Sequence, residues 1–184
     1  TDKYRRVIWQ CNSKFKKGEK CATPHFTENE IKERFIQAWN GMQNITDEVI
    51  SECRLALAEL FDSAAIDDEF AAKNAEAEVL IEMNRKHIAE NASAAQDQKA
   101  YKKRQEELVS KYNAVVKRID ELKAEMEKRK IQRTVLTAFI DTMEQQRGSL
   151  TEFDESLWLA VVEKATVHAD GRLVFTLMDG SEIE

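Results

Sequence analysis

Proline, glycine and long apolar runs are scarce in this sequence of 184 residues. It contains one proline, Pro24, and five glycines, with 34% charged and 42% hydrophobic residues. This composition favours long helices over a β-sandwich or β-barrel, which need many turn residues. No apolar run approaches the roughly 20 residues that a transmembrane helix requires, and no signal-peptide pattern opens the chain. We therefore expect no membrane partner and a cytoplasmic location.

Cysteine is also sparse, since the chain contains only Cys11, Cys21 and Cys53. Three cysteines without a secretory signal indicate a reducing compartment. A structural zinc needs four ligands, usually in two pairs, and Cys11 and Cys21 form one pair. They are consistent with structural or free thiols, with half of a zinc site, or with a disulfide across a hairpin; His25 is the first candidate for an additional ligand. Cys53 has helical spacing from apolar residues on either side, which indicates burial.

The residue types of a catalytic site are not grouped along the sequence. His25, His87 and His168 fall in three different predicted elements, and there is no phosphate-cradling glycine loop or nucleophile elbow. Acidic pairs such as Glu106-Glu107 fall on helix faces, where we expect them to be solvated. We therefore do not expect this chain to be an enzyme.

The net charge of −6 argues against a uniformly basic protein, but the charge is unevenly distributed. Residues 1–20 contain seven Lys or Arg and two acidic residues, so this segment is +5 and the remainder is −11. A local basic patch on an acidic protein can bind phosphate groups. The candidate phosphate-binding residues are Arg5, Arg6, Lys14, Lys16, Lys17 and Lys20.

The first third of the chain predicts a strand and two helices. Residues 3–11 have high β-propensity. Thr27 and Glu30 form a capping box, so a helix should begin there and end just before Gly41, which supplies the left-handed C-terminal residue. A second helix is predicted over residues 46–61.

The middle of the chain carries a heptad pattern, in which seam positions recur alternately every three and four residues. The longer seam comprises Tyr101, Gln105, Leu108, Tyr112, Val115, Ile119, Leu122, Met126, Arg129, Arg133, Leu136, Ile140 and Met143. A second seam comprises Phe70, Asn74, Ala77, Ile81, Asn84, Ile88 and Asn91. Between the seams, residues 92–98 are small or polar and predict a turn, and a break is predicted at residues 62–68.

The two seams match when the chain is folded back at about Gln96. Antiparallel partners must have residue numbers with a constant sum, and the sums alternate between 192 and 193 over the whole length. The pattern therefore predicts an antiparallel coiled-coil hairpin, roughly 40 Å long at about 1.5 Å per residue. Asn74, Asn84 and Asn91 place polar groups in the seam, which lowers stability but specifies register and partner.

The C-terminal segment predicts a short helix and a hairpin. Residues 153–164 have helical apolar spacing. Residues 166–178 contain Asp170-Gly171, the pair preferred in type I′ turns, and Asp179-Gly180 marks another turn. Strands are therefore expected from both chain ends and helices from the middle.

These patterns together predict an α+β, mostly helical fold. Residues 1–61 and 127–184 should form a small body of strands and helices. Residues 62–126 should form a long projecting antiparallel coiled-coil arm, with its tip near 92–98.

Several segments, in this order along the chain, resemble one known family. They are Tyr4-Arg5-Arg6 through Cys11, Cys21-Ala-Thr-Pro-His25, the capped helix start Thr27–Glu30, Asn91 through Tyr101, Glu152 through Trp158, and Val167 through Ile183. Together they are similar to the C-terminal part of large serine recombinases, the serine integrases and resolvase-invertase relatives. The resemblance implies a zinc-ribbon DNA-binding domain with a coiled-coil insertion.

What the resemblance implies is a non-catalytic fragment of a bacterial or phage-encoded enzyme of DNA recombination and integration. The body would bind double-stranded DNA at attachment sites. The arm would contact other recombinase subunits, support synapsis and influence direction, including the response to a directionality factor. The residues expected at the arm tip are Ala92, Ser93, Ala94, Ala95, Gln96, Asp97 and Gln98.

The zinc ribbon implied by the resemblance is truncated. Cys11 and Cys21 match the second ligand pair, and the chain begins at Thr1, after the position of the first C-x-x-C pair. Zinc is expected in the full-length family and none in this fragment. The alternative hypothesis is a coiled-coil structural adaptor that binds a protein partner without DNA, which the −11 remainder of the chain also suits.

Overall fold

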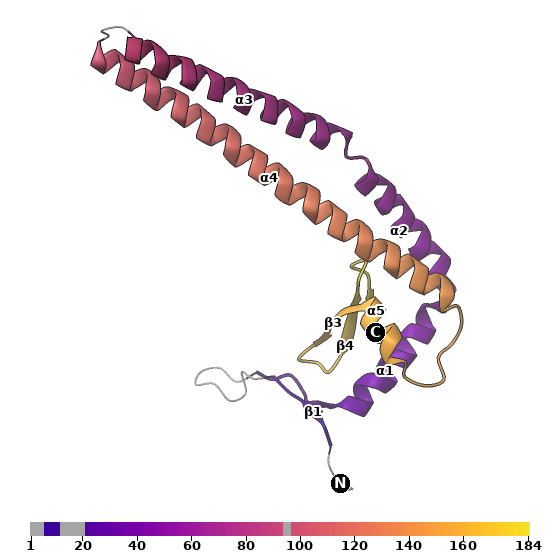
Figure 1. Cartoon of the computed structure of the whole chain (residues 1–184). Helices are drawn as coiled ribbons and strands as arrows, with labels where there is room; N and C mark the ends of the chain where they lie inside the picture. The colour runs from indigo at the N-terminus through magenta and orange to yellow at the C-terminus, as the bar shows by residue number, and fades with distance from the viewer. Residues whose placement is uncertain (1–5, 12–20, 94–96) are drawn as a thin grey trace. The chain divides into compact units, whose positions relative to one another are not determined.

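The computed structural model describes residues 6–11, 21–93 and 97–184 (Figure 1). Helices hold 71% of these residues, and none of the described helices is long and apolar enough to cross a membrane. The elements are β1 (Ile8–Trp9), β2 (Phe26–Thr27), α1 (Glu28–Met42), the 3-10 helix η2 (Gln43–Ile45), α2 (Thr46–Phe61), α3 (Ala64–Ser93), α4 (Gln98–Gln145), α5 (Glu155–Val161), β3 (Val162–Val167), β4 (Leu173–Leu177) and β5 (Glu182–Ile183). The chain divides into two compact units: unit 1 (Thr1–Ala58 and Thr134–Glu184) and unit 2 (Glu59–Arg133).

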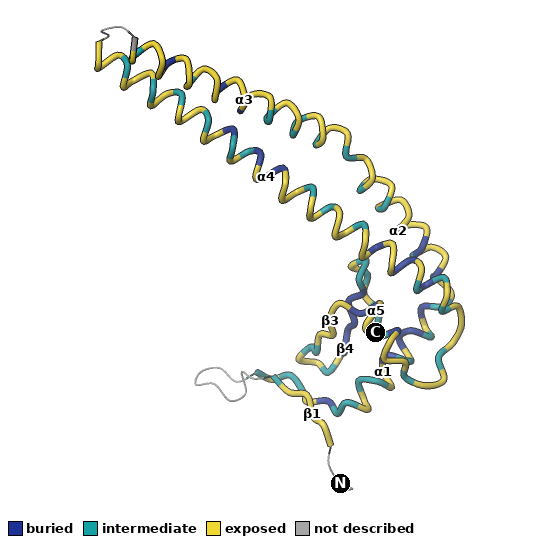
Figure 2. The backbone as a smooth tube through the Cα atoms, in the orientation of Figure 1, coloured by how far each residue is buried: buried dark blue, intermediate teal, exposed yellow. Residues whose placement is uncertain are grey.

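Two small antiparallel sheets come from the two ends of the chain, as the sequence predicted. β1 pairs with β2 and opposes Trp9 to Phe26; within the described part of the strand predicted over residues 3–11, only Ile8 and Trp9 are paired. The second sheet has the order β3-β4-β5. Every residue of β4 is buried, whereas most of β3 is exposed (Figure 2). β4 is therefore the strand through which the second sheet packs in the core of unit 1.

Helix α1 begins where the capping box predicted. The Thr27 hydroxyl accepts a hydrogen bond from the Glu30 N–H at 3.2 Å, and the Glu30 carboxylate accepts one from the Thr27 N–H at 2.7 Å. The predicted end was wrong, because Gly41 lacks a positive φ and α1 continues to Met42. Met42 is buried in the core, and the 3-10 turn η2 leads directly into α2. The chain therefore needs no left-handed residue at Gly41.

Phe35 lies at the centre of unit 1. Its ring is fully buried, and it lies 5.0–6.1 Å from four aromatic rings, those of Trp39, Phe153, Trp158 and Phe175. Three of these contacts are edge-to-face, an arrangement that the quadrupoles of aromatic rings favour. The cluster joins α1 to α5 and β4, so residues from both ends of the chain form one core.

The turn at Asp170-Gly171 differs from the predicted type I′ geometry, and the predicted turn at Asp179-Gly180 has the same observed form. The Gly171 N–H donates to the His168 carbonyl at 3.0 Å, and the Gly180 N–H donates to the Leu177 carbonyl at 2.9 Å. A type I′ turn needs positive φ at both central residues, but only the glycines have it, each at 89°, and Asp170 does not. Each turn is therefore a three-residue loop closed by a left-handed glycine.

Helix α5 is shorter than the segment 153–164 that the sequence predicted. The Asp154 carboxylate caps it by accepting hydrogen bonds from the Ser156 and Leu157 N–H groups at 2.8 and 3.0 Å. The helix ends at Val161 because Val162 begins β3 and pairs with Leu177 of β4. Pairing with a buried strand overrides the helical spacing here.

Helices α3 and α4 pack against each other in unit 2 (Figure 1). Ala77 and Leu80 of α3 form a buried cluster with Val115 and Ile119 of α4, and partly buried residues extend it in both directions. Every α4 position of the predicted seam, from Tyr101 to Met143, is buried or half-buried. The seam prediction for α4 is therefore confirmed at the level of burial.

The α3 seam is shifted by one residue at alternate positions. Leu80 and His87 are buried, with 9% and 3% of their surface exposed, whereas the predicted Ile81 and Ile88 are 48% and 49% exposed. Both choices keep the three-and-four spacing, so hydrophobicity alone does not distinguish them. The His87 ring stacks on Tyr101 at 4.4 Å, which fits the observed alternative.

Two arginines of the predicted seam cover the break between α2 and α3. The break consists only of Asp62 and Ser63 and is shorter than predicted. Arg129 donates a hydrogen bond to the Asp62 carbonyl at 3.2 Å, and the Arg133 guanidinium lies 5.1 Å from the centre of the Phe61 ring. These contacts explain why cations occupy seam positions that would otherwise be apolar.

Candidate nucleic-acid interface

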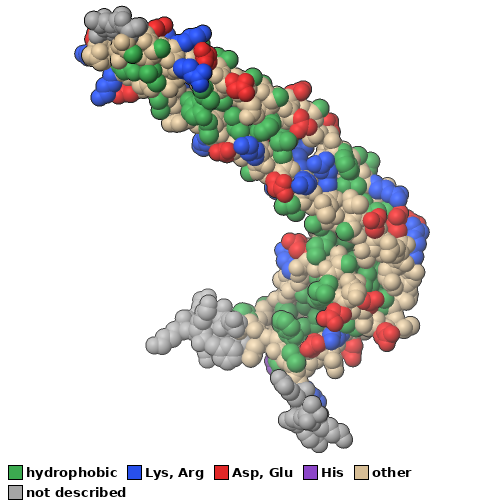
Figure 3. All heavy atoms as spheres, viewed as in Figure 1, with side chains coloured by type: hydrophobic (Ala, Val, Ile, Leu, Met, Phe, Trp, Pro, Cys, Tyr) green, Lys and Arg blue, Asp and Glu red, His purple; other side chains and the backbone are tan. Residues whose placement is uncertain are grey.

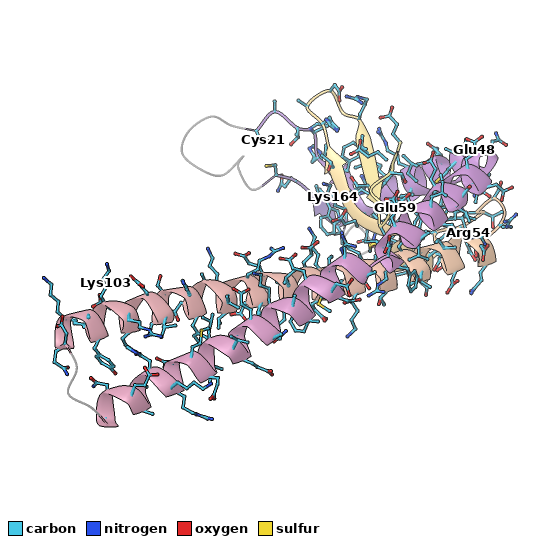
Figure 4. The ribbon with its side chains drawn as sticks, turned by 90° about the horizontal axis from the view of Figure 1, so that it is seen from above. Cys21, Glu48, Arg54, Glu59, Lys103 and Lys164 are labelled. Carbon is cyan, nitrogen blue, oxygen red and sulfur yellow. The ribbon has the colours of Figure 1, made fainter. Side chains whose placement is uncertain are left out.

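Cys11 and Cys21 lie on the two chain segments that lead away from β1 and into β2. Both are half-buried, and no disulfide joins any of the three cysteines. Extending the β1–β2 register would place Cys11 opposite Pro24, so the two thiols are offset along the ladder. Cys21 Sγ lies 3.0 Å from the Thr23 hydroxyl (Figure 4 labels Cys21).

The described residues around this pair do not complete a zinc site. A structural zinc needs four nitrogen or sulfur ligands, and in residues 6–11, 21–93 and 97–184 no three His, Cys, Asp or Glu side chains are grouped to hold a metal. His25, the proposed additional ligand, is exposed. Cys11 and Cys21 therefore represent at most half of a ligand set here.

Arg6 is the only predicted phosphate-binding residue within the described ranges. Arg5, Lys14, Lys16, Lys17 and Lys20 lie outside them. Arg6 is exposed and lines a cleft of about 430 Å³ beside the start of α1, together with Glu28 and Glu30. Hydrogen bonds from the Thr27 N–H and hydroxyl lower the pKa of Glu30, which keeps this carboxylate ionised beside the arginine. Beside these two carboxylates, Arg6 does not by itself make this cleft strongly positive.

Sequence reasoning missed a second basic position, Arg34 on α1. Its guanidinium lies 4.8 Å from the Phe26 ring centre and donates to the Gly171 carbonyl at 3.2 Å. It shares a cleft of about 340 Å³ with Arg172 and Glu184. Arg172 is paired with Asp170 and Glu184, whereas Arg34 has no carboxylate within salt-bridge distance among the described residues. No local signal identifies Arg34, because its partner Gly171 lies at the other end of the chain.

An apolar groove of unit 1 was not predicted. Its volume is about 450 Å³, and Ile31, Trp158 and Val167 line it. Trp9 and Leu159 also line it and are 59% and 68% exposed. The groove lies beside β1, so it adjoins the strand that carries the basic segment.

The predicted arm tip is described only in part. Ala94, Ala95 and Gln96 and the side chain of Ser93 lie outside the described structure, and Ala92 is exposed. The Asp97 side chain accepts a hydrogen bond from the Lys99 N–H at 2.9 Å and so caps α4. Gln98 donates to the Asn91 side chain at 3.3 Å, which links the two helices at this end.

The other titratable residues are dispersed or buried. His25 is exposed on the segment before β2, His87 is buried between α3 and α4, and His168 lies in the β3–β4 turn. Cys53 is buried, as predicted, with its Sγ 3.7 Å from the Asp179 carboxylate. Burial and this carboxylate raise the pKa of the Cys53 thiol to about 12, so the thiol stays protonated and structural.

Comparisons of the chain with protein-family models, curated proteins and solved structures found no match.

Proposed function

We propose that this chain is the non-catalytic C-terminal part of a serine recombinase or integrase. The observation that carries the proposal is the interruption of one compact α+β unit, assembled from both chain ends, by a helical segment of residues 59–133. The order of elements is a cysteine pair, a capped helix, a helical insertion and a C-terminal sheet. This is the order that the resemblance to serine recombinases implies.

Unit 1 binds the backbone of double-stranded DNA in this proposal. The supporting features are the basic segment of residues 1–20 and the exposed position of Arg6 beside β1. Arg34 is a second basic position of unit 1, and the Phe26 ring and the Gly171 carbonyl hold its guanidinium in place. In a full-length protein, zinc bound by Cys11, Cys21 and an upstream pair would order the two strands at this surface.

Unit 2 contacts other recombinase subunits through an antiparallel coiled-coil hairpin of α3 and α4. The buried cluster of Ala77, Leu80, Val115 and Ile119 supports the hairpin. Asn84 supports a role in partner choice, because its side-chain oxygen is buried without a hydrogen-bond partner in the described structure. Residues 92–98 at the turn would make the contacts that favour synapsis and respond to a directionality factor.

Salt-dependent binding to a short DNA duplex tests the unit 1 part of the proposal. Replacing Lys14, Lys16 and Lys17 by Gln should weaken binding and flatten its dependence on salt, since each lost phosphate contact lowers the slope of log K against log salt by about 0.9. The matched control replaces Lys117, Lys123 and Lys130, exposed lysines of α4 that pair with nearby carboxylates. Identical binding curves for the two variants would contradict DNA binding through the basic segment.

Recombination by the full-length protein tests the unit 2 part. Replacing residues 92–98 with a flexible linker of equal length should prevent the joining of two DNA sites while binding to a single site persists. Unaltered recombination in both directions would reject the subunit-contact role.

A protein-binding adaptor is the second candidate function. It is favoured by the exposed apolar side chains Ile81 and Val109, which line a groove of about 110 Å³ with Asn84 and Tyr112. This candidate predicts a stable complex with a protein partner and no affinity for DNA at low salt, even with the upstream ligand pair restored.

A further inference from the structure

The end of unit 2 near the α3–α4 turn carries a dense group of basic side chains. Two are near the end of α3 and four are in the first two turns of α4: Arg85, Lys86, Lys99, Lys102, Lys103 and Arg104. We call this set the distal basic cluster. Only Glu90 and Asp97 oppose it within residues 85–104, so this stretch is +4 in a chain of net charge −6. Figure 3 shows Lys and Arg side chains at this end, and Figure 4 labels Lys103 near the start of α4.

Folding does not explain this cluster. Arg85 and Lys86 share a single carboxylate, Glu82, at 3.5 and 3.9 Å. The four α4 members have no carboxylate within salt-bridge distance in the part of the chain that the structure describes. Lys99 also lies in the first turn of α4, where the helix dipole disfavours positive charge. Intramolecular ion pairs therefore do not account for the α4 members, and this indicates an external anionic partner.

Contacts between the two helices hold the cluster together as one surface. The buried His87 ring stacks on Tyr101 at 4.4 Å, and His87 Nε2 donates to the Tyr101 carbonyl at 3.2 Å. Gln98 bonds to Asn91 one turn further out. The basic side chains of α3 and α4 therefore project from a paired scaffold.

The chemistry of the surface fits a nucleic-acid backbone better than a protein. Within the described part of residues 85–104, Ile88 is the only exposed large apolar side chain; the other exposed apolar side chains are alanines, and Tyr101 is half-buried in its stack. Protein interfaces rely on aromatic and large apolar anchors and are depleted in lysine. Flexible lysines, spaced by about 5–6 Å one helical turn apart, suit contacts to successive phosphates without sequence readout.

We infer that the distal basic cluster is a second site that binds the DNA backbone. It is distinct from the basic segment of unit 1, and the inference does not depend on DNA binding by unit 1. Such a site would let the far end of unit 2 contact a DNA segment, at an affinity that falls steeply with salt.

The test compares two triple variants of the full chain on a short duplex across about 50 to 200 mM salt. The first replaces Lys99, Lys102 and Lys103 by Gln, and the matched control replaces Lys117, Lys123 and Lys130 on the same helix. The distal variant should lose up to about eightfold in affinity per contact at 0.1 M salt, with a slope lower by about 0.9 per contact. The control should bind like the original chain. Thermal melting of the distal variant should be unchanged or slightly raised, because the charge of Lys99 in the first turn of α4 is removed.

Equal binding by the distal variant and the control would overturn the inference. So would a distal variant that binds DNA normally but loses self-association in sedimentation, because the cluster would then be a protein contact. The Lys14, Lys16 and Lys17 variant separates this result from the proposed function. If that variant binds normally while the distal variant does not, the second site stands and the unit 1 site fails.

Discussion

Replacing Phe35 by alanine tests whether the aromatic cluster holds unit 1 together. The ring is fully buried and lies edge-to-face with Trp158 at 5.0 Å and with Phe175 at 5.7 Å. Core Phe→Ala substitutions cost about 3–5 kcal/mol, and aromatic pairs contribute about 0.5–1.5 kcal/mol beyond their buried area. We expect the Phe35→Ala variant to lose about 3–5 kcal/mol, a large share of the roughly 5–15 kcal/mol that stabilises a typical domain.

Urea denaturation followed by tryptophan fluorescence measures this loss. All three tryptophans, Trp9, Trp39 and Trp158, belong to unit 1, so the signal reports on that unit. With a denaturant slope of about 2 kcal/mol/M, the unfolding midpoint should fall by about 1.5–2.5 M.

The Phe61→Ala variant is the matched control, followed by far-UV circular dichroism because Phe61 belongs to unit 2. Phe61 is 61% exposed. Among the described residues, the only aromatic or cation–π contact of its ring is with the guanidinium of Arg133. An exposed cation–π contact contributes about 0.5–1 kcal/mol, so this variant should lose no more than that. If Phe35→Ala costs less than about 1 kcal/mol, or no more than the control, the aromatic cluster is not the centre of the fold.

Three further predictions follow from single positions. Gly41→Ala should stabilise the protein by about 0.5–1 kcal/mol, because Gly41 lies inside a helix with open space around it. Gly171→Ala should destabilise the protein by about 1 kcal/mol or more, because the φ of Gly171 is 89°. The melting temperature should therefore rise for the first variant and fall for the second. The Cys53 thiol should react last with a thiol reagent in the native protein. The pKa of this thiol is raised from 9.0 to about 12, so the protonated thiol should contribute its full stabilisation below pH 9 and progressively less as pH rises toward 12. Denaturation at a series of pH values should show this dependence in the original protein and not in the Cys53→Ala variant. Asn84→Leu should raise the unfolding free energy of the α3–α4 pair by about 1–2 kcal/mol in far-UV circular dichroism, since it removes a buried oxygen without a partner, and a destabilised variant would show that this oxygen has a partner.

Local sequence signals were sufficient wherever the stabilising contacts form between residues close together in the chain. The Thr27–Glu30 capping box and the start of α1 could be predicted because all atoms involved lie within four residues. The α4 seam could be predicted because a heptad repeat over many turns makes one face of the helix predominantly apolar. Burial of Cys53 followed from the same helical spacing.

Positions with two locally equivalent solutions could not be predicted. Ile81 and Leu80 are similar in hydrophobicity and both satisfy the heptad spacing, so only packing against α4 selects Leu80. The Asp170-Gly171 pair suits more than one turn type, and only strand pairing on both sides selects the observed loop. The position of Arg34 depends on Gly171, and no sequence pattern links residues so far apart.

The sequence alone determined the mostly helical character, the starts of α1 and α2 and the uneven charge, because these depend on neighbouring residues and on composition. It also determined that strands come from both chain ends. Tertiary structure alone decided that Phe35 meets Phe175, that the arginines at 129 and 133 cover the α2–α3 break, and that His87 rather than Ile88 enters the seam. The physical reason is that a side chain is buried only where a second surface covers it. Hydrophobicity and helical spacing limit which residues can be buried, but the element that packs against the helix decides which of them are.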